Sequence, residues 1–221
     1  SAARLSYQQA QSAIDGQTDE KTAPILETIL QPLWQAYSIA LKGRDARGPL
    51  DLNLPERKIL LKPDGTVDRV EVPERLDAHK LIEEFMIQAN VAAAETLEAK
   101  KSALVYRVHE SPSLEKLESL REFLRSLEIT LSRSGNLRPH HFNDILARVA
   151  ETEHEIVVNQ VVLRSQSQAA YSPANLGHFG LNLRRYAHFT SPIRRYADLI
   201  VHRALVSALG LGEGGMPAGF E

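Results

Sequence analysis

Apolar residues recur every three or four positions along several stretches of the chain, which is the spacing of an amphipathic helix. This pattern predicts a long helix over residues 24–44 and a longer one over residues 74–101, where neither glycine nor proline interrupts the sequence. A short helix is expected after Ser6, which is a good N-cap residue, and is expected to end at Gly16. The last helix is expected over residues 191–209.

Strand patterns are fewer than helix patterns. Residues 57–72 have β-rich arms around the turn residues 63–65 (Pro-Asp-Gly), and they predict a hairpin. Residues 103–109 are apolar enough for a buried strand, which we expect to be isolated.

The remaining pattern fixes the fold class. Residues 113–168 predict two or three helices, interrupted near Gly135 and Pro139. The whole is an α+β fold dominated by helix, in which the hairpin and the isolated strand pack on the long helices. We expect one domain over residues 1–210 and a flexible end over residues 211–221.

Composition excludes several classes of protein. The 221 residues include no cysteine, so disulfides and thiolate metal sites are impossible, which fits a reducing, cytoplasmic location. No apolar run has the roughly 20 residues of a membrane span. A net charge of -2 argues against a generally basic nucleic-acid coat, so any binding of anions must be local.

The stretch YAHFTSPIRRYADLIVHR, residues 186–203, is such a local site. With Ser191 as N-cap, Arg194 and Arg195 fall in the first turn of the last helix, where the helix dipole disfavours cations. A bound anion reverses that cost, because backbone donors and guanidinium groups then converge on it. The alternative is a simple ion pair between Arg194 and Asp198 four residues later.

The preceding loop adds further candidates for holding an RNA backbone. Arg184 and Arg185 supply charge, and His188 lies among aromatic residues whose faces suit stacking on bases. The aromatic residues suit a packed core equally well, and core is the preferred role for Phe179 and Phe189. Three further residues of this region have simpler roles: His202 is expected to be a hydrogen-bonded structural histidine, and glycines 177 and 180 permit a tight turn or a close approach of a ligand backbone.

Two acids interrupt the apolar face of the helix predicted over residues 74–101. Glu83 and Glu84 are adjacent, so one of them must point toward the apolar side. That carboxylate either pairs with a base such as Arg75 or Lys80, or it lines a cleft. Spacing alone leaves the two alternatives open.

Four stretches in the same order resemble the RNB catalytic domain of the ribonuclease II/ribonuclease R family, and in detail they are closer to ribonuclease R. They are ARLSYQQAQSAI, DAHKLIEEFMIQANVAAA, ALVYRVHESPSLEKL and GHFGLNLRRYAHFTSPIRRYADLIVHRAL. The resemblance covers residues 4–205, which is nearly the whole chain.

The resemblance implies a hydrolytic 3′-to-5′ exoribonuclease that uses Mg²⁺, acts on the 3′ end of single-stranded RNA and releases nucleoside 5′-monophosphates. By the same resemblance, Arg194 contacts the region of the scissile phosphate and Glu83 helps to place the 3′-terminal nucleotides. Tyr7 contacts the RNA near its 3′ end, or serves as a core residue. Arg195, which neighbours Arg194 in the anion-binding turn, is expected to belong to the same RNA-binding surface. Leu52 stands roughly where some relatives have a phenylalanine that stacks on a base.

One element of the family pattern is missing from the sequence. The family binds its metal through closely spaced aspartates upstream of the ARLSY stretch, whereas the first aspartates here are single residues. We therefore expect the chain to be the C-terminal part of an RNB domain, separated from that segment and from the flanking cold-shock and S1 modules. No metal site and no tightly bound cofactor are expected in it, and the isolated chain is expected to be inactive. The alternative is a non-catalytic RNA-binding or regulatory module that keeps only the phosphate-binding half.

Overall fold

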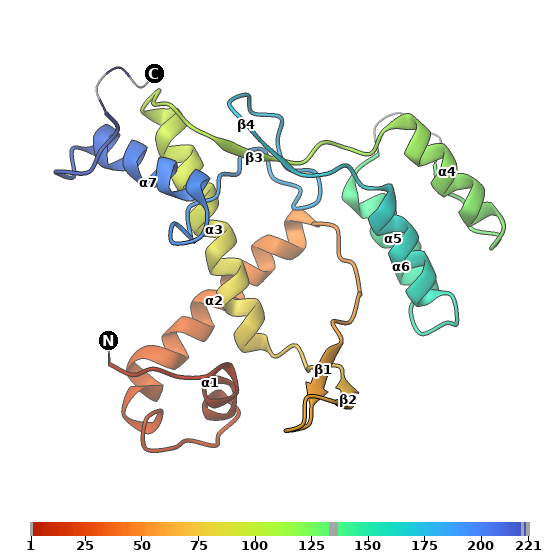
Figure 1. Ribbon diagram of the computed structural model, residues 1–221, viewed down its shortest axis with the longest axis horizontal. Helices are drawn as coiled ribbons and strands as arrows, with labels where there is room; N and C mark the ends of the chain where they lie inside the picture. Colours follow the sequence, from red (N-terminus) through yellow and green to blue (C-terminus); the bar gives the residue numbers. More distant parts are fainter. Residues whose placement is uncertain (1, 133–136, 218, 220–221) are drawn as a thin grey trace. The chain divides into compact units, whose positions relative to one another are not determined.

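The computed structural model describes residues 2–132, 137–217 and 219, and the chain divides into two compact units. The first unit comprises Ser1–Gly43 and Asn53–Phe85, and the second comprises Arg44–Leu52 and Met86–Glu221. Helices dominate both units, and the strands described form two separate two-stranded sheets (Figure 1). The predicted helix-dominated α+β class is confirmed.

Helix α1 (Tyr7–Ile14) opens the first unit as predicted. The Ser6 hydroxyl accepts a hydrogen bond from the Gln9 amide at 3.1 Å, and the Gln9 side chain accepts one from the Ser6 amide at 3.0 Å. This reciprocal capping box satisfies two amides that the first turn leaves without partners. The side chain of Gln11 also accepts the Ala78 amide at 3.0 Å, which ties α1 to the start of α3 (Asp77–Ala99).

The helix predicted over residues 24–44 is present, but its beginning is irregular. A short 3₁₀ turn, η1 (Ala23–Ile25), and a π turn, η2 (Leu26–Leu30), precede the regular helix α2 (Gln31–Arg47). Pro24 lies in the 3₁₀ turn and Pro32 lies in the first turn of α2. Proline lacks an amide hydrogen and clashes with the preceding turn, so a regular α-helix cannot run through this stretch.

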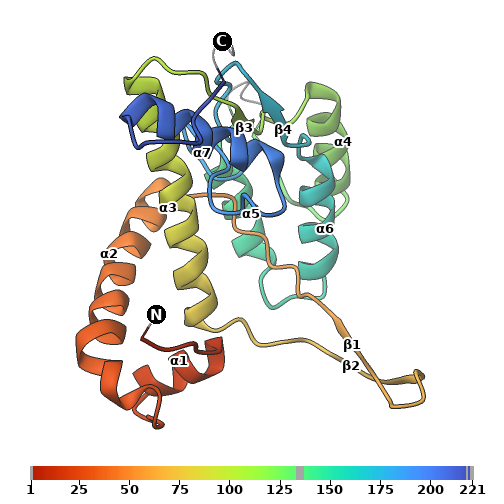
Figure 2. The same cartoon turned by 60° about the vertical axis from the view of Figure 1, so that its left-hand side comes forward.

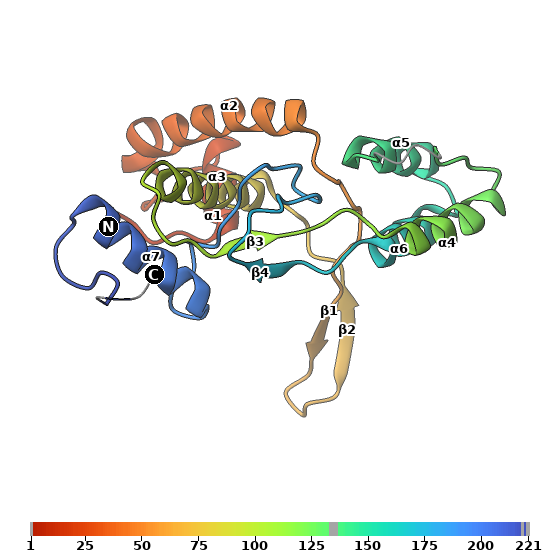
Figure 3. The ribbon, with the colours of Figure 1, turned by 90° about the horizontal axis from the view of Figure 1, so that it is seen from above.

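The predicted hairpin is confirmed as β1 (Lys58–Leu61) paired antiparallel with β2 (Val67–Glu71). Its turn is held by the Asp64 carboxylate, which accepts the Thr66 amide at 2.9 Å, and by Gly65 at a φ of +82°. Nearly every residue of the two strands is exposed, and in Figure 3 the hairpin projects away from helices α1 and α2 of its own unit. The expected packing of the hairpin on long helices is therefore wrong for the described residues.

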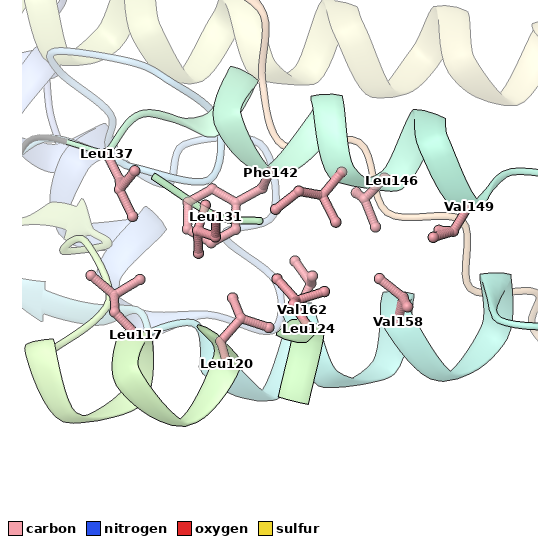
Figure 4. Close-up of a cluster of buried hydrophobic side chains, with 11 residues drawn as sticks. Leu117, Leu120, Leu124, Leu131, Leu137, Phe142, Leu146, Val149, Val158 and Val162 are labelled. Atoms are coloured by element: carbon pink, nitrogen blue, oxygen red, sulfur yellow. The ribbon is translucent and has the colours of Figure 1, made fainter. Parts of the chain in front are cut away.

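Three helices of the second unit form a bundle around an apolar core: α4 (Leu114–Arg125), α5 (Pro139–Val149) and α6 (Glu155–Ser165). The sequence predicted two or three helices here, and Pro139 begins α5 rather than interrupting a helix. Position 135 lies outside the described residues. Figure 4 shows side chains of the three helices, with Leu131 and Leu137, pointing toward one another around Phe142, which is fully buried.

The buried strand near residue 106 is not isolated, which corrects the prediction. Strand β3 (Tyr106–Val108) pairs antiparallel with β4 (Ala170–Ser172), as Figure 3 shows. The partner has only three residues, too few for a period-two pattern to be visible in the sequence. The pair joins the end of α3 to the long loop that carries most of the candidate site.

Helix α7 (Tyr196–Leu209) packs on the C-terminal half of α3 through small side chains (Figure 2). Ala93 and Ala94 of α3 meet Ala187, Val201 and Ala204 there, and all five are buried. Small side chains at these positions let the two backbones approach closely. The predicted start of the helix at residue 191 is wrong, because the regular helix begins five residues later.

We expect Phe142→Ala to lower the free energy of unfolding by about 3–5 kcal/mol, because the truncation leaves a cavity in the bundle. The measurement is urea unfolding followed by far-ultraviolet circular dichroism. Leu114→Ala is the matched control, since Leu114 is 73% exposed and should cost less than about 1 kcal/mol. Equal losses from the two variants would contradict the assignment of this core.

Candidate functional site

Arg194 and Arg195, in the stretch 186–203, lie in a separate turn and not in the first turn of a helix. The amides of Arg194 and Arg195 both donate to the Ser191 carbonyl, at 3.3 and 3.2 Å, which closes a single turn after Pro192. Arg195 then adopts extended backbone angles (φ -127°, ψ 117°), so the helix restarts at Tyr196. Ser191 therefore does not cap α7, and the predicted placement of the arginines is corrected.

Asp198 holds this turn in place. Its carboxylate is fully buried. It accepts one hydrogen bond from the Ser191 amide and two from Arg195, through Nε and a terminal nitrogen, and each is 2.8 Å long. Burial raises the pKa of this carboxyl, but the hydrogen bonds from Arg195 and Ser191 outweigh it, so the pKa lies below its usual value. The alternative pairing of Asp198 with Arg194 is wrong, since the partner is Arg195.

Arg194 has the opposite environment. Its side chain is exposed, next to the fully exposed Ile193, and among the described residues no carboxylate forms an ion pair with it. The charge of Arg195 is compensated by Asp198, whereas that of Arg194 is not. The turn therefore presents one guanidinium group to solvent.

The arginine pair of the preceding loop repeats this division. Arg185 forms an ion pair with Glu98 through Nε and lies 3.7 Å from a carboxylate oxygen of Glu95, both on α3. Arg184 is exposed, and no ion pair to it is found in the described part of the chain.

Glu98 links three segments of the second unit. Besides Arg185, it accepts the Tyr106 hydroxyl at 2.7 Å and the Asn175 side-chain amide at 3.0 Å. Burial raises its pKa, but the hydrogen bonds from Tyr106 and Arg185 reverse the shift and leave it below the usual value. Burial and the same contact raise the pKa of Tyr106 to about 12. No sequence pattern indicated this role for Glu98.

Arg184 lines a cavity of about 890 Å³ in the second unit. The cavity is formed by the end of β3, the beginnings of α4 and α5, and the loop from Leu176 to Arg184. The loop approaches His109 closely at Gly180, where a Cβ atom would come within 2.9 Å of the imidazole Nδ1. Gly177 takes a φ of +71°, as a tight turn requires. The predicted tight turn is confirmed at Gly177.

The histidines behind this loop are neutral. His109 accepts the Gly180 amide at Nδ1 (2.9 Å) and lies 2.8 Å from the Ser167 carbonyl at Nε2, which fixes the tautomer with hydrogen on Nε2. Burial, with a smaller effect from the positive charge of Arg107, lowers the pKa of His178 to about 3. Burial and the charge of Arg195 lower the pKa of His188 to about 4. His188 therefore contributes no positive charge at neutral pH.

The aromatic rings of this region pack against one another. Phe179 packs against the helical bundle, and Phe189 packs against the cluster between α3 and α7, so the core role predicted for both is confirmed. His188 makes edge-on contacts with Tyr171 and Tyr186, and its Nδ1 lies 2.8 Å from the Tyr171 hydroxyl. Its ring is half-buried in these contacts.

Two polar residues of helices α3 and α7 fix the segment between the arginine pairs. Asn90 is buried, donates to the Tyr186 hydroxyl at 2.9 Å and accepts the Phe189 amide at 2.8 Å. His202 lies 2.8 Å from the Phe189 carbonyl and stacks on its ring, which confirms the structural role predicted for it. Asn90 was not identified from the sequence, although a polar amide next to several alanines of one helix is a visible sign of a buried hydrogen-bonding residue.

Tyr7 and Glu83 lie in the first unit. The Tyr7 ring stacks on His79 at 4.1 Å, and His79 lies one turn before Glu83 on the same face of α3. Glu83 forms an ion pair with Arg75, and Lys80 pairs with Asp77. The alternatives proposed from the sequence concerned the acid on the apolar side, so the ion pair of Glu83 does not decide between them. Glu84 is the buried member of the pair.

Two further predictions concern the metal ligands and Leu52. Within residues 2–132, 137–217 and 219, no group of three or more metal-ligating side chains comes together. The residues present therefore do not fit a magnesium site. Leu52 is partly buried against the helical bundle.

The comparisons with known proteins agree with this fold. The fold and the two exposed arginines define only a broad class, a helix-rich α+β domain with a candidate anion site. The family model of the RNB domain is more specific, and it matches residues 1–210. The chain belongs to the RNB domain family. Ribonuclease R of Vibrio cholerae and ribonuclease R of Escherichia coli K12 are each 39% identical to it over 96% of the chain. The chain spans 26% of the length of each relative.

A solved structure shows the same arrangement of elements. The RNase R of Mycoplasma genitalium, in complex with ribose-methylated single-stranded RNA, superposes with a TM-score of 0.83 and 30% identity. The match covers 92% of this chain and 32% of that one.

Among the described residues, no helix is long and apolar enough to cross a membrane.

The neutral histidines predict a dependence of stability on pH. His178 and His188 stay unprotonated in the folded protein, but they take up protons in the unfolded chain below their ordinary pKa of 6.5. The unfolded state then binds more protons, so stability is complete above pH 6.5 and declines as the pH falls toward 4. The expected slope is at most about 1.4 kcal/mol per pH unit for each histidine.

Urea unfolding between pH 7.5 and 5 measures this slope, in a range where the carboxylates contribute little. His178→Gln should flatten the curve. A free energy of unfolding that stays constant from pH 6.5 to 5 would contradict the prediction.

Proposed function

We propose that the chain is the phosphate-recognition part of a hydrolytic 3′-to-5′ exoribonuclease that acts on single-stranded RNA in the cytoplasm and releases nucleoside 5′-monophosphates. The observation that carries the proposal is Arg194, an exposed arginine with no ion pair among the described residues, on a turn fixed by Asp198. A guanidinium group so placed favours an anion with several acceptor oxygens, such as a phosphodiester. The RNA in the Mycoplasma genitalium structure supports this choice of ligand.

The proposed roles divide between the two units. In the second unit, Arg194 contacts the scissile phosphate, and Arg184, Arg185, Arg195 and His188 form the RNA-binding surface around it. In the first unit, Glu83 places the 3′-terminal nucleotides and the Tyr7 ring contacts RNA near its end. The exposed ring of Tyr7, stacked on His79 one turn from Glu83, is compatible with that role.

The chemical step needs a part that this chain does not provide. Magnesium, when bound, would activate water and stabilise charge at the phosphate, and it requires several carboxylate oxygens. No such group occurs in the described part of the chain. We therefore assign the metal ligands to an upstream segment of a longer protein, which also carries the cold-shock and S1 modules.

The missing metal ligands equally favour a second candidate, a non-catalytic RNA-binding or regulatory module. The reading frame upstream of Ser1 separates the two candidates. Closely spaced aspartates about a hundred residues before Tyr7, the distance implied by the family pattern, favour the enzyme. A start codon immediately before Ser1 favours the binding module.

The isolated 221-residue chain should bind a single-stranded oligonucleotide but not degrade it when Mg²⁺ is added. The measurement is thin-layer separation of nucleoside monophosphates released from a uniformly labelled RNA. The same chain joined to its upstream segment is the positive control. Monophosphate release by the isolated chain would show that it carries its own metal site.

In the longer protein, Arg194→Ala should lower kcat by roughly 100-fold or more, as expected for loss of a contact that strengthens in the transition state. The Kd for RNA should change less than tenfold. Arg148→Ala is the matched control, because Arg148 is an exposed arginine on α5, away from the turn. A weaker Kd with an unchanged kcat would indicate that Arg194 serves only in binding.

A further inference from the structure

The second unit contains two Arg-Arg pairs, Arg184-Arg185 and Arg194-Arg195, and the two pairs share one design. In each pair the second arginine forms an ion pair with a helical carboxylate, while the first is exposed and has no ion pair among the described residues. The pairs use different carboxylates on different helices, Glu98 on α3 and Asp198 on α7. The same division thus arises twice from independent contacts.

The division follows from the contacts of the second arginine. Arg194 lies in the turn that closes on the Ser191 carbonyl, and Arg195 follows it with extended backbone angles. The Asp198 carboxylate holds the Arg195 side chain by two hydrogen bonds, whereas the Arg194 side chain is exposed.

Electrostatics separates Arg194 from Arg195 further, whereas Arg185 is held less tightly because its side chain is 43% exposed. The Arg195 guanidinium donates two hydrogen bonds to Asp198, and its side chain is only 20% exposed. If Arg195 turned toward a phosphate, it would leave a buried carboxylate without its countercharge, which is strongly unfavourable. Arg194 can bind a phosphate without breaking any ion pair.

We infer that Arg185 and Arg195 are positioning residues that do not contact RNA, and that Arg184 and Arg194 are the arginines that bind its phosphates. This inference rests on the proposed function and sharpens it, because it divides four RNA-binding candidates into two contacts and two anchors. Glu98 and Asp198 become part of the RNA site, although acids on an RNA-binding surface are usually unfavourable. Their charges are already compensated by the anchors.

Double-mutant cycles test the division. Binding of a fluorescein-labelled single-stranded oligouridylate is measured by anisotropy for the chain and for Arg194→Ala, Arg195→Ala and the double variant. If Arg195 acts through Arg194, each single variant weakens binding roughly fivefold, and the double variant weakens it little further. The same set is made for Arg184 and Arg185.

The salt dependence of binding distinguishes a lost contact from general loosening. Removal of one phosphate contact lowers the slope of log K against log salt by about 0.7 for single strands. Each double variant should therefore lose about 0.7 once. Additive weakening, with a further loss of about 0.7 from each anchor, would overturn the inference. Arg148→Ala is the control and should leave the slope unchanged.

Two further variants guard against unfolding. Arg195→Lys keeps the charge but loses the two-point contact with Asp198, and it should reproduce the loss of binding seen for Arg195→Ala. Full RNA binding by a folded Arg195→Lys protein would argue against positioning. Circular dichroism verifies that each variant is folded, and the partly exposed Arg185 offers a milder truncation.

A measurement without RNA separates this inference from the proposed function. Inorganic phosphate is added to labelled protein, and the arginine Nε–H resonances are followed by NMR. Phosphate should shift Arg184 and Arg194 and leave Arg185 and Arg195 unchanged, whereas equal shifts in all four would sink the division. If the oligouridylate fails to bind while this phosphate pattern holds, the proposed RNA function fails and the division of the arginines stands.

Discussion

The candidate site depends on one buried carboxylate. Asp198 has no exposed surface, and its oxygens are occupied by the Ser191 amide and the Arg195 guanidinium. A buried charge is tolerated only when it is paired and hydrogen-bonded, so the backbone of residues 191–195 must adopt a shape that brings those donors to it. That requirement outweighs the intrinsic preference of a Ser-Pro sequence to start a helix at once. The outward direction of Arg194 is a consequence of this pairing.

The rest of the site has little regular structure of its own and is held by α3 through polar contacts. Glu98 fixes Arg185, Tyr106 and Asn175, while Asn90 fixes Tyr186 and the amide of Phe189. Between these contacts, Ala93 and Ala94 allow α7 and the loop to approach the helix closely. A helix thus provides the rigid frame, and a loop carries the chemistry, which is a common division in binding sites. It explains why α3 is both the longest helix and free of glycine and proline.

The sequence predicted the elements well and the contacts between them poorly. Ser6, the Pro-Asp-Gly turn and the apolar stripes of the bundle carry local signals, so α1, the hairpin and α4 to α6 could be located. Three-residue strand β4 carries no such signal, and its pairing with β3 depends on contacts between distant segments. The start of α7 was wrong for a similar reason, since capping rules describe Ser191 and its neighbours but not a carboxylate seven residues away. The two arginines of each Arg-Arg pair are identical in sequence but have different environments. Only the positions of Glu98 and Asp198 in the fold distinguish them.

Charge compensation also explains how a chain with a net charge of -2 could recognise a polyanion. A generally basic surface would bind nucleic acid without regard to register, whereas two uncompensated arginines on fixed backbone define where a phosphate can lie. Charged histidines beside these arginines would add further positive charge, and the position of a bound phosphate would be less well defined. Burial keeps His178 and His188 neutral, so the positive charge of the loop does not vary near neutral pH. The paired acids, the neutral histidines and the exposed arginines are therefore parts of one arrangement. Two of the four arginine charges are compensated by acids, so that the other two act at defined positions.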